Sequence, residues 1–235
     1  MYTPREAARR IAPTTIALVS GPRSKSYWAR SSVRFARSMN PATAAAISSA
    51  GWPPSVKVRI VISGFIERLV DARIGATFNF YRDGERAALL RGRLEAYLES
   101  HIEAPLLVVA EAPGYRGARI SGVPLTSERQ LTGDGPAEAT ATIVHAALDE
   151  LCLSDRVLLW NVVPTHPGDS RSNRRPSRGE IAAGLPFARE LARGRRVVAV
   201  GRIAHAAFGG DYIRHPAHGG ATDFRRGLAL AGTIA

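Results

Sequence analysis

The stretch LLVVAEAPGYRG, residues 106–117, decides the fold class of this chain. It begins with an unbroken apolar run, Leu106–Ala110, which is typical of a strand buried on both faces of a sheet. It ends in a loop that contains proline and glycine, which interrupt regular structure. A buried strand that ends in such a loop is expected in an open α/β sheet, where ligands bind beyond the carboxyl ends of the strands.

Strands and helices alternate along the rest of the chain. Apolar residues at three- and four-residue spacing predict helices over 85–100, 137–151, 178–192 and 202–208. Continuous apolar runs predict further strands over 157–160 and 197–201, and the short segment 212–214 gives a weaker signal for a fourth. This alternation predicts an α/β fold, a single three-layer domain with a central, mainly parallel four-stranded sheet flanked by helices.

Composition excludes several classes of protein. Apolar residues make up 45% of the 235 residues, so wholesale disorder is excluded. No run approaches the ~20 apolar residues of a membrane-spanning helix, so no membrane association is expected. Cys152 is the single cysteine, which excludes an internal disulfide framework and an all-cysteine iron–sulfur cluster within one chain.

The formal net charge of +12 is concentrated near the N-terminus. Residues 1–65 hold ten basic residues and one acidic residue, so the remainder is only mildly basic. We therefore divide the chain into a basic Ser-, Ala- and Arg-rich extension over 1–64, expected to be disordered, and a folded domain over 65–235. A transit peptide for an organelle and a DNA-clamping arm are the alternatives for the extension. The expected location is the cytoplasm, at the bacterial nucleoid.

Three polar side chains follow the predicted strands at equivalent positions. Glu111 follows the first strand, Asn161 ends the second, and His215 follows the fourth. Because the carboxyl ends of parallel strands share one edge of the sheet, we expect these side chains to converge on one crevice.

The residues around this crevice resemble the motifs of the uracil-DNA glycosylase superfamily. The matching segments are Ala110–Gly114, Gly122–Leu125, Asn161–Pro164 and His215–Ala217. The resemblance runs from about Phe65 to the C-terminus and is closest to the branch whose first motif carries Glu-Ala-Pro-Gly. It implies a monofunctional DNA N-glycosylase that hydrolyses the N-glycosidic bond of flipped-out deoxyuridine in base excision repair.

The chemistry of base excision suits the residues at these motifs. The carboxamide of Asn161 can accept from uracil N3–H and donate to O4, a pattern that cytosine reverses. His215 can donate to O2 while charge develops on the leaving base. Glu111 either orients the attacking water or shapes its loop, because Ala112 stands where related branches carry Asp or Asn. The resemblance implies that uracil is bound by Ala112, Tyr115, Leu125 and Asn161. Leu125 stands at the position of a stacking aromatic, and Tyr115 is a candidate to stack on the base in its place or to block the C5 methyl of thymine.

Basic side chains near these motifs are candidates for DNA contacts. We expect phosphate contacts from Arg171, Arg174, Arg175 and Arg225. His218 is a candidate to enter the gap in the duplex. The expected partner is uracil-containing DNA, single- or double-stranded, bound by a monomer. No metal or organic cofactor is expected, and no lysine at the motifs could form a Schiff base.

Besides Leu125, the chain departs from its closest branch in the His218-Gly219-Gly220 continuation of the last motif and in its cysteines. Members of that branch carry four cysteines for an iron–sulfur cluster, and here Thr165 and Gly184 stand at two of those positions. Two alternatives to a uracil-DNA glycosylase stay open. One is a glycosylase for another deaminated base, and the other is a non-catalytic DNA- or nucleotide-binding module on the same fold.

Overall fold

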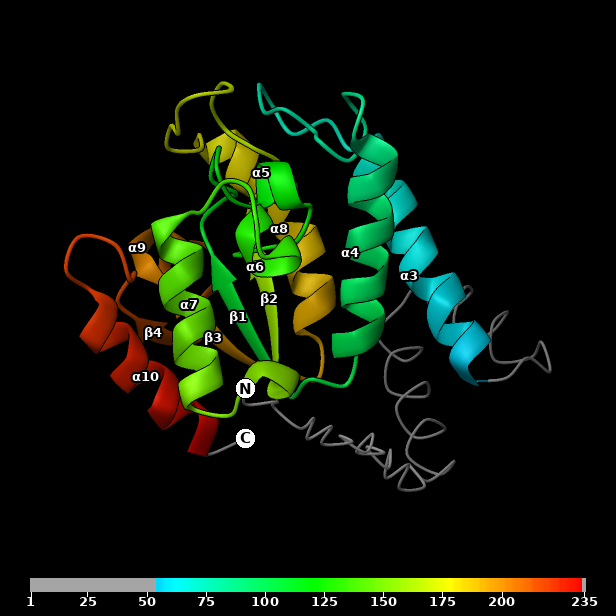
Figure 1. Ribbon diagram of the computed structural model, residues 1–235. Coiled ribbons are helices and arrows are strands. Elements are labelled where there is room, and N and C mark those ends of the chain that lie inside the picture. Colours follow the sequence, from blue (N-terminus) through cyan, green and yellow to red (C-terminus); the bar gives the residue numbers. More distant parts are fainter. Residues whose placement is uncertain (1–53, 234–235) are drawn as a thin grey trace, which may run out of the picture.

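A parallel sheet forms the centre of the protein, which we describe from a computed structural model covering residues 54–233 (Figure 1). Its strands run in the order β2-β1-β3-β4, and every neighbouring pair is parallel. The strands are β1 (Leu106–Ala110), β2 (Val157–Asn161), β3 (Arg196–Val200) and β4 (Asp211–Ile213). The expected α/β fold with a four-stranded sheet is confirmed, and all four strands are parallel.

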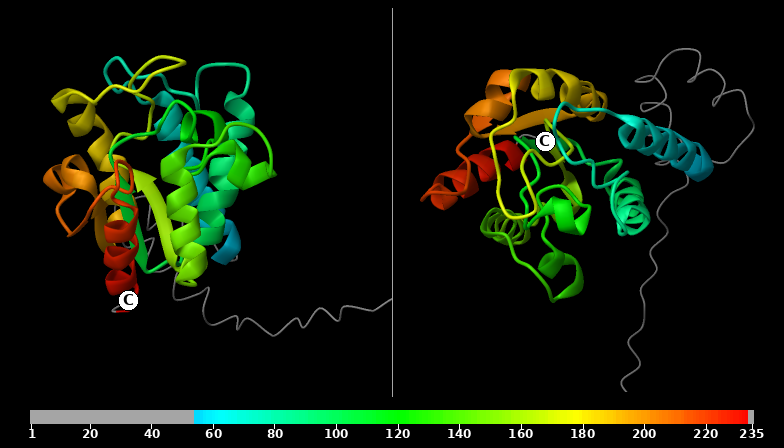
Figure 2. Two further views of the ribbon diagram at one scale, coloured as in Figure 1. Left: turned by 60° about the vertical axis from the view of Figure 1, so that its left-hand side comes forward. Right: turned by 90° about the horizontal axis from the view of Figure 1, so that it is seen from above.

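Helices connect the strands and cover both faces of the sheet (Figures 1 and 2). They are α3 (Pro54–Asp71), α4 (Ala87–His101), α5 (Ala118–Ser121), α6 (Glu128–Thr132), α7 (Ala139–Glu150), the 3-10 turn η1 (Ser154–Arg156), α8 (Arg178–Ala192), α9 (Gly201–Phe208) and α10 (Ala221–Thr233). The four predicted helices correspond to α4, α7, α8 and α9. Within residues 54–233, no helix is long and apolar enough to span a bilayer.

The alternation of side chains in β1 creates two cores. Leu107 and Val109 pack with residues of α3, α4, α8 and α9 on one face. Leu106, Val108 and Ala110 pack with residues of α7 and α10 on the other. We call these the α8/α9 face and the α7/α10 face. Side chains alternate between the two faces of a strand. The first residue beyond a strand is expected to continue this alternation, so its side chain can be assigned to one of the two faces.

Helix α3 corrects the expected domain boundary at residue 65. It begins at Pro54, and its side chains Val58, Val61 and Ile62 are buried in the α8/α9 core. The helix packs on α4, where Arg59 pairs with Glu99 at 2.8 Å. The packed domain therefore extends back to α3. The expected disorder over residues 1–53 lies outside the described residues.

Candidate active site

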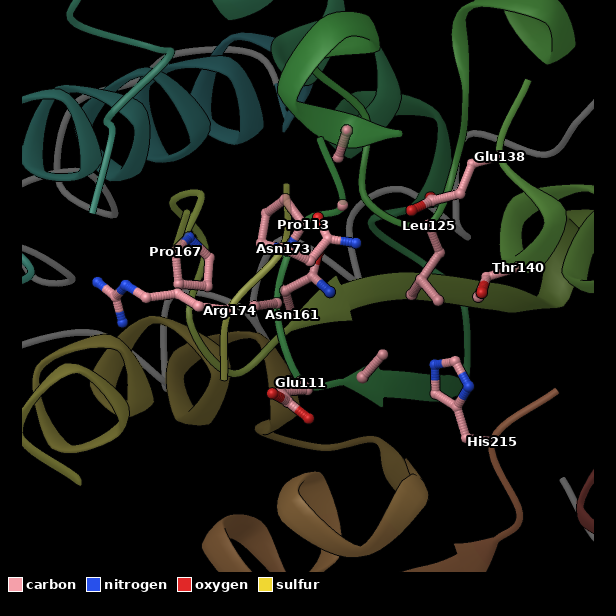
Figure 3. A pocket seen from close by; sticks show the side chains of 14 residues that line it. Glu111, Pro113, Leu125, Glu138, Thr140, Asn161, Pro167, Asn173, Arg174 and His215 are labelled. Carbon is pink, nitrogen blue, oxygen red and sulfur yellow. The ribbon is translucent and has the colours of Figure 1, made fainter. Parts of the chain in front are cut away.

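A cavity of about 180 Å³ opens at the carboxyl ends of the strands. Its lining comes from the loops after β1, β2 and β4 and from the start of α7 (Figure 3). The lining residues are Ala110, Glu111, Ala112, Pro113, Gly114, Ala118, Leu125, Glu138, Thr140, Asn161, Pro167, Asn173, Arg174 and His215. The structure thus brings the polar residues predicted at the three strand ends to one cavity.

Asn161 presents an unsatisfied acceptor to this cavity. It is the last residue of β2 and only 2% exposed. Its Oδ1 is buried and has no hydrogen-bond partner among the described residues. An unpaired buried polar atom costs about 1–3 kcal/mol, which a ligand carrying an N–H group would offset. Asn161 is therefore arranged to receive a donor from a bound molecule.

His215 faces the cavity as a neutral hydrogen-bond donor. The backbone N–H of Ala217 donates to Nδ1 of His215 at 3.2 Å. In the neutral ring the proton therefore lies on Nε2. Burial, reinforced by the nearby His218, lowers the pKa of His215 below its ordinary value of 6.5, which keeps the ring neutral at pH 7. A neutral imidazole with a fixed N–H can donate to an oxygen that gains negative charge.

Close packing holds the His215 loop in place. A Cβ on Gly220 would lie 2.0 Å from the His215 carbonyl oxygen, so the loop can close only around glycine. His218 occupies the exposed tip with a φ of 54°, in the left-handed region. The tip expected to enter the duplex is thus an exposed turn outside the cavity.

Leu125 supplies an apolar wall in a strained backbone conformation. It is 6% exposed and has a φ of 52°, which is rare for a leucine. The segment before it is fixed by Gly122, whose carbonyl accepts from the Tyr81 hydroxyl at 2.9 Å. Backbone strain held by surrounding packing is frequent at functional sites.

Glu111 and Ala112 line the cavity but occupy different surroundings from Asn161. Glu111 follows Ala110, which belongs to the α7/α10 face, so the alternation of the strand directs Glu111 to the α8/α9 face. Burial raises the pKa of the Glu111 carboxyl, and the charge of Arg175 opposes this shift. Ala112 contributes no polar side chain.

The loop over residues 171–175, which we call the arginine loop, follows β2 and is expected to contact DNA phosphates. One of its arginines instead binds within the fold. Arg174 lines the cavity, but its guanidinium makes two hydrogen bonds to the buried carboxylate of Glu180, at 2.6 and 2.7 Å. These bonds are the main reason that the pKa of Glu180 falls from 4.5 to about 2. All three arginines of this loop are exposed, but the guanidinium of Arg174 is engaged by Glu180 within the fold.

Two other predicted residues lie outside the cavity lining. Arg225, on α10, pairs with Glu150 at the end of α7 at 2.8 Å. Tyr115 is half-buried, and its backbone N–H donates to Oδ1 of Asn173 at 2.8 Å. Asn173 therefore ties the arginine loop to the loop after β1.

Sequence reasoning missed Glu138, Thr140 and Asn173, which also line the cavity. Glu138 and Thr140 lie at the start of α7, far from any recognised motif. The signal available in the sequence was that Glu138 stands at the start of the predicted helix 137–151, where an acidic side chain is favourable. In the structure its side chain makes no capping hydrogen bond. Among the described residues, no three His, Cys, Asp or Glu side chains are arranged as metal ligands.

The residues present do not fit an iron–sulfur cluster. The hydroxyl of Thr165, which is fully buried, lies 2.5 Å from the hydroxyl of Thr77. A Cβ on Gly184 would lie 2.5 Å from the carbonyl oxygen of Val162, so backbone fills the space that a cysteine would need. The single cysteine, Cys152, is exposed.

Comparisons with known proteins agree with this architecture. The crystal structure of wild-type Pedobacter heparinus SMUG2 matches with a TM-score of 0.53 at 12% sequence identity, covering 72% of this chain and 97% of that one. At this identity the match shows the fold alone. A search of curated proteins found no match. The family model for the uracil DNA glycosylase superfamily matches residues 97–231, more than half of the chain. The protein therefore belongs to the uracil DNA glycosylase superfamily.

Proposed function

We propose that this protein is a monofunctional uracil-DNA glycosylase of base excision repair. The observation that carries the proposal is the unpaired, buried Oδ1 of Asn161 in the same cavity as His215. An acceptor for an N–H and a donor for a carbonyl oxygen are the complement of a uracil edge. Membership of the superfamily supports DNA glycosylase activity in general, and the cavity chemistry favours uracil as its base.

Recognition begins with a nucleotide flipped out of the stack, at a cost of a few kcal/mol. Asn161 then accepts from N3–H and donates to O4 of uracil. Cytosine presents an acceptor at N3 and a donor at N4, so its binding would leave buried groups unpaired. Leu125 offers an apolar surface beside the base plane.

Cleavage moves the electron pair of the glycosidic bond onto the base. Nε2–H of His215 stabilises the charge that develops at O2, and a preorganised donor of this kind contributes roughly 3 kcal/mol. Water adds to C1′ of the deoxyribose, which leaves an abasic site and free uracil. The lysines of the chain, Lys25 and Lys57, lie outside the motifs in the sequence, which favours simple hydrolysis over a lyase step through a Schiff base.

Binding to the DNA backbone is assigned to the exposed side chains beside the cavity. Arg171 and Arg175 supply positive charge that contacts phosphates without reading sequence. The exposed tip at His218 is the candidate for contact with the gap left by the flipped nucleotide.

Release of free uracil from an oligonucleotide tests the proposal. The wild-type protein is expected to release uracil from single-stranded DNA or from a U·G mismatch, and to leave matched thymine and cytosine intact. His215→Ala and Asn161→Ala are expected to lower the rate constant by about 10²–10³-fold. Absence of release by the wild-type protein would favour the non-catalytic module. If another deaminated base in a substrate panel is released faster than uracil, that base is the substrate and not uracil.

A further inference from the structure

Glycosidic bond hydrolysis calls for a carboxylate near the sugar, and the cavity is lined by two, Glu111 and Glu138. Their positions relative to Asn161 differ. In β2, Leu158 and Trp160 pack on the α8/α9 face, and Val157 and Leu159 pack on the α7/α10 face. Asn161 continues the second set, so its side chain points to the α7/α10 face.

Glu138 shares the side of the cavity to which Asn161 points. It directly precedes α7, a helix of the α7/α10 face. Figure 3 shows Glu138, Leu125, Thr140 and His215 together on the right of the view, with Asn161 and Glu111 nearer its centre, Glu111 below Asn161. The alternation of β1 likewise directs Glu111 to the α8/α9 face, toward Arg175.

The loop after β1 is shaped around the Glu138 carboxylate. A Cβ on Gly114 would lie 1.7 Å from Oε1 of Glu138, and a Cβ on Gly117 would lie 2.0 Å from Oε2. One carboxylate oxygen thus lies over each glycine, where any other side chain would displace it. Both glycines are needed to admit this side chain to the cavity wall.

This position is fixed by packing rather than by a polar partner. Although Glu138 is at the N-cap of α7, its side chain makes no capping bond, and the described residues provide it with no ion pair. Burial raises the pKa of its carboxyl. A half-buried carboxylate without a partner is destabilising in the free protein, which is expected of a group that acts on a ligand.

On the basis of the proposed function, we propose that Glu138 is the carboxylate that faces the flipped-out deoxyuridine and acts on the attacking water. The C1′–N1 electron pair leaves with the base, and the water oxygen then bonds to C1′. The Glu138 carboxylate accepts the proton that the water loses, and the proton then passes to the uracil anion or to solvent. The negative charge also stabilises the oxocarbenium-like sugar before the water bond forms. In this arrangement Glu111 shapes its own loop.

Single-turnover release of uracil from a single-stranded oligonucleotide tests the assignment. Glu138→Gln preserves the size of the side chain over both glycines. We expect it to lower the rate constant by 10²–10⁴-fold, the range typical of a lost general base, with DNA affinity changed less than threefold. Glu138→Asp is expected to retain part of the activity. Glu67→Gln, an exposed position on α3, is the matched control.

The rival variant is Glu111→Gln. A larger loss of rate in Glu111→Gln than in Glu138→Gln would overturn the assignment. So would near wild-type activity in Glu138→Gln, and loss confined to Glu138→Ala would make Glu138 a packing residue only. The melting temperature of Glu138→Gln should match or exceed that of the wild type, which separates lost chemistry from unfolding.

The pH profile provides a second readout. The other titratable groups lining the cavity are Glu111, Arg174 and His215. If Glu138 must be ionised, the wild-type rate falls at acid pH, and the residual rate of Glu138→Gln lacks that fall. Absence of uracil release by the wild-type protein would overturn the proposed function and this assignment together. Release of uracil by wild type and Glu138→Gln at closely similar rates would overturn this assignment alone.

Discussion

The backbone N–H of Ala217 donates to Nδ1 of His215 at 3.2 Å, and this bond determines which ring nitrogen carries the proton. Protonation of Nδ1 would turn this acceptor into a donor. Two N–H groups, one of His215 and one of Ala217, would then face each other, which is unfavourable. The ring is thus held neutral by both its burial and its partner. The same relationship makes the stability of the fold depend on pH.

Stability should fall as the pH drops below about 6.5. The pKa of His215 is lowered in the folded state, so the unfolded chain binds the proton more readily. The contribution of His215 to the free energy of unfolding is therefore complete above pH 6.5, the ordinary pKa of a histidine. It is lost as the pH falls through the lowered pKa of the folded state. His215→Asn keeps an acceptor near Ala217 and does not titrate. Melting temperatures from pH 7.5 to 5 should fall more steeply for the wild type, and parallel curves would contradict this prediction.

Gly220→Ala should impair excision more than it impairs folding. The added Cβ would lie 2.0 Å from the His215 carbonyl oxygen, so the loop must shift and carry the donor with it. A misplacement of about 1 Å in a catalytic group can lower the rate about 10²-fold. Gly92→Ala is the control, because its Cβ meets nothing within 4 Å inside α4. That variant should be more stable by about 0.5–1 kcal/mol, with an unchanged rate.

Glu180→Gln should destabilise the protein at neutral pH by about 2 kcal/mol. The carboxylate is 3% exposed and accepts from Arg174 and from the backbone N–H groups of Ala76 and Ser177. Because its folded pKa is about 2 against 4.5, the contribution is complete above pH 4.5 and disappears as the pH falls toward 2. Urea midpoints of the two proteins should therefore converge at acid pH. A constant difference across this range would assign the effect to packing.

Arg171→Ala and Arg175→Ala should weaken DNA binding at low salt with little effect on stability. Each removes one exposed positive charge beside the cavity, so the slope of log K against log salt concentration should decrease by about 1 per lost phosphate contact. Arg174→Ala should mainly lower the melting temperature, because it unpairs the buried Glu180 carboxylate. Equal salt slopes for all three variants and the wild type would exclude this loop from the DNA interface.

The three longer strands could be predicted because each is largely a continuous apolar run, whereas β4 has only three residues and two of them are exposed. The predicted run Leu106–Ala110 coincides with β1. Helix α3 was missed because its exposed face carries Arg59 within a strongly basic region, which masked the apolar spacing of Val58, Val61 and Ile62. Net charge along a segment reports its solvent face and says little about its buried face.

The site could be predicted where a residue ends a strand and not elsewhere. Asn161 and His215 were found because parallel strands bring their carboxyl ends together. Glu138 was not found, because it reaches the cavity across a loop whose two glycines have meaning only once the fold is known. The pairing of Arg174 with Glu180 was also missed, because a charge pair six residues apart in a loop has no periodic signature.

The packing around Gly184 limits how this chain could be interconverted with relatives that hold a cluster. Restoring a cysteine there would force its Cβ against the Val162 carbonyl, on the segment that follows Asn161. Cysteines placed at Thr165 and Gly184 would therefore not be enough to build a cluster site, because the backbone next to Asn161 would have to move first. The close approach of α8 to the segment after β2 thus ties the side-chain choice at Gly184 to the path of the main chain beside the cavity.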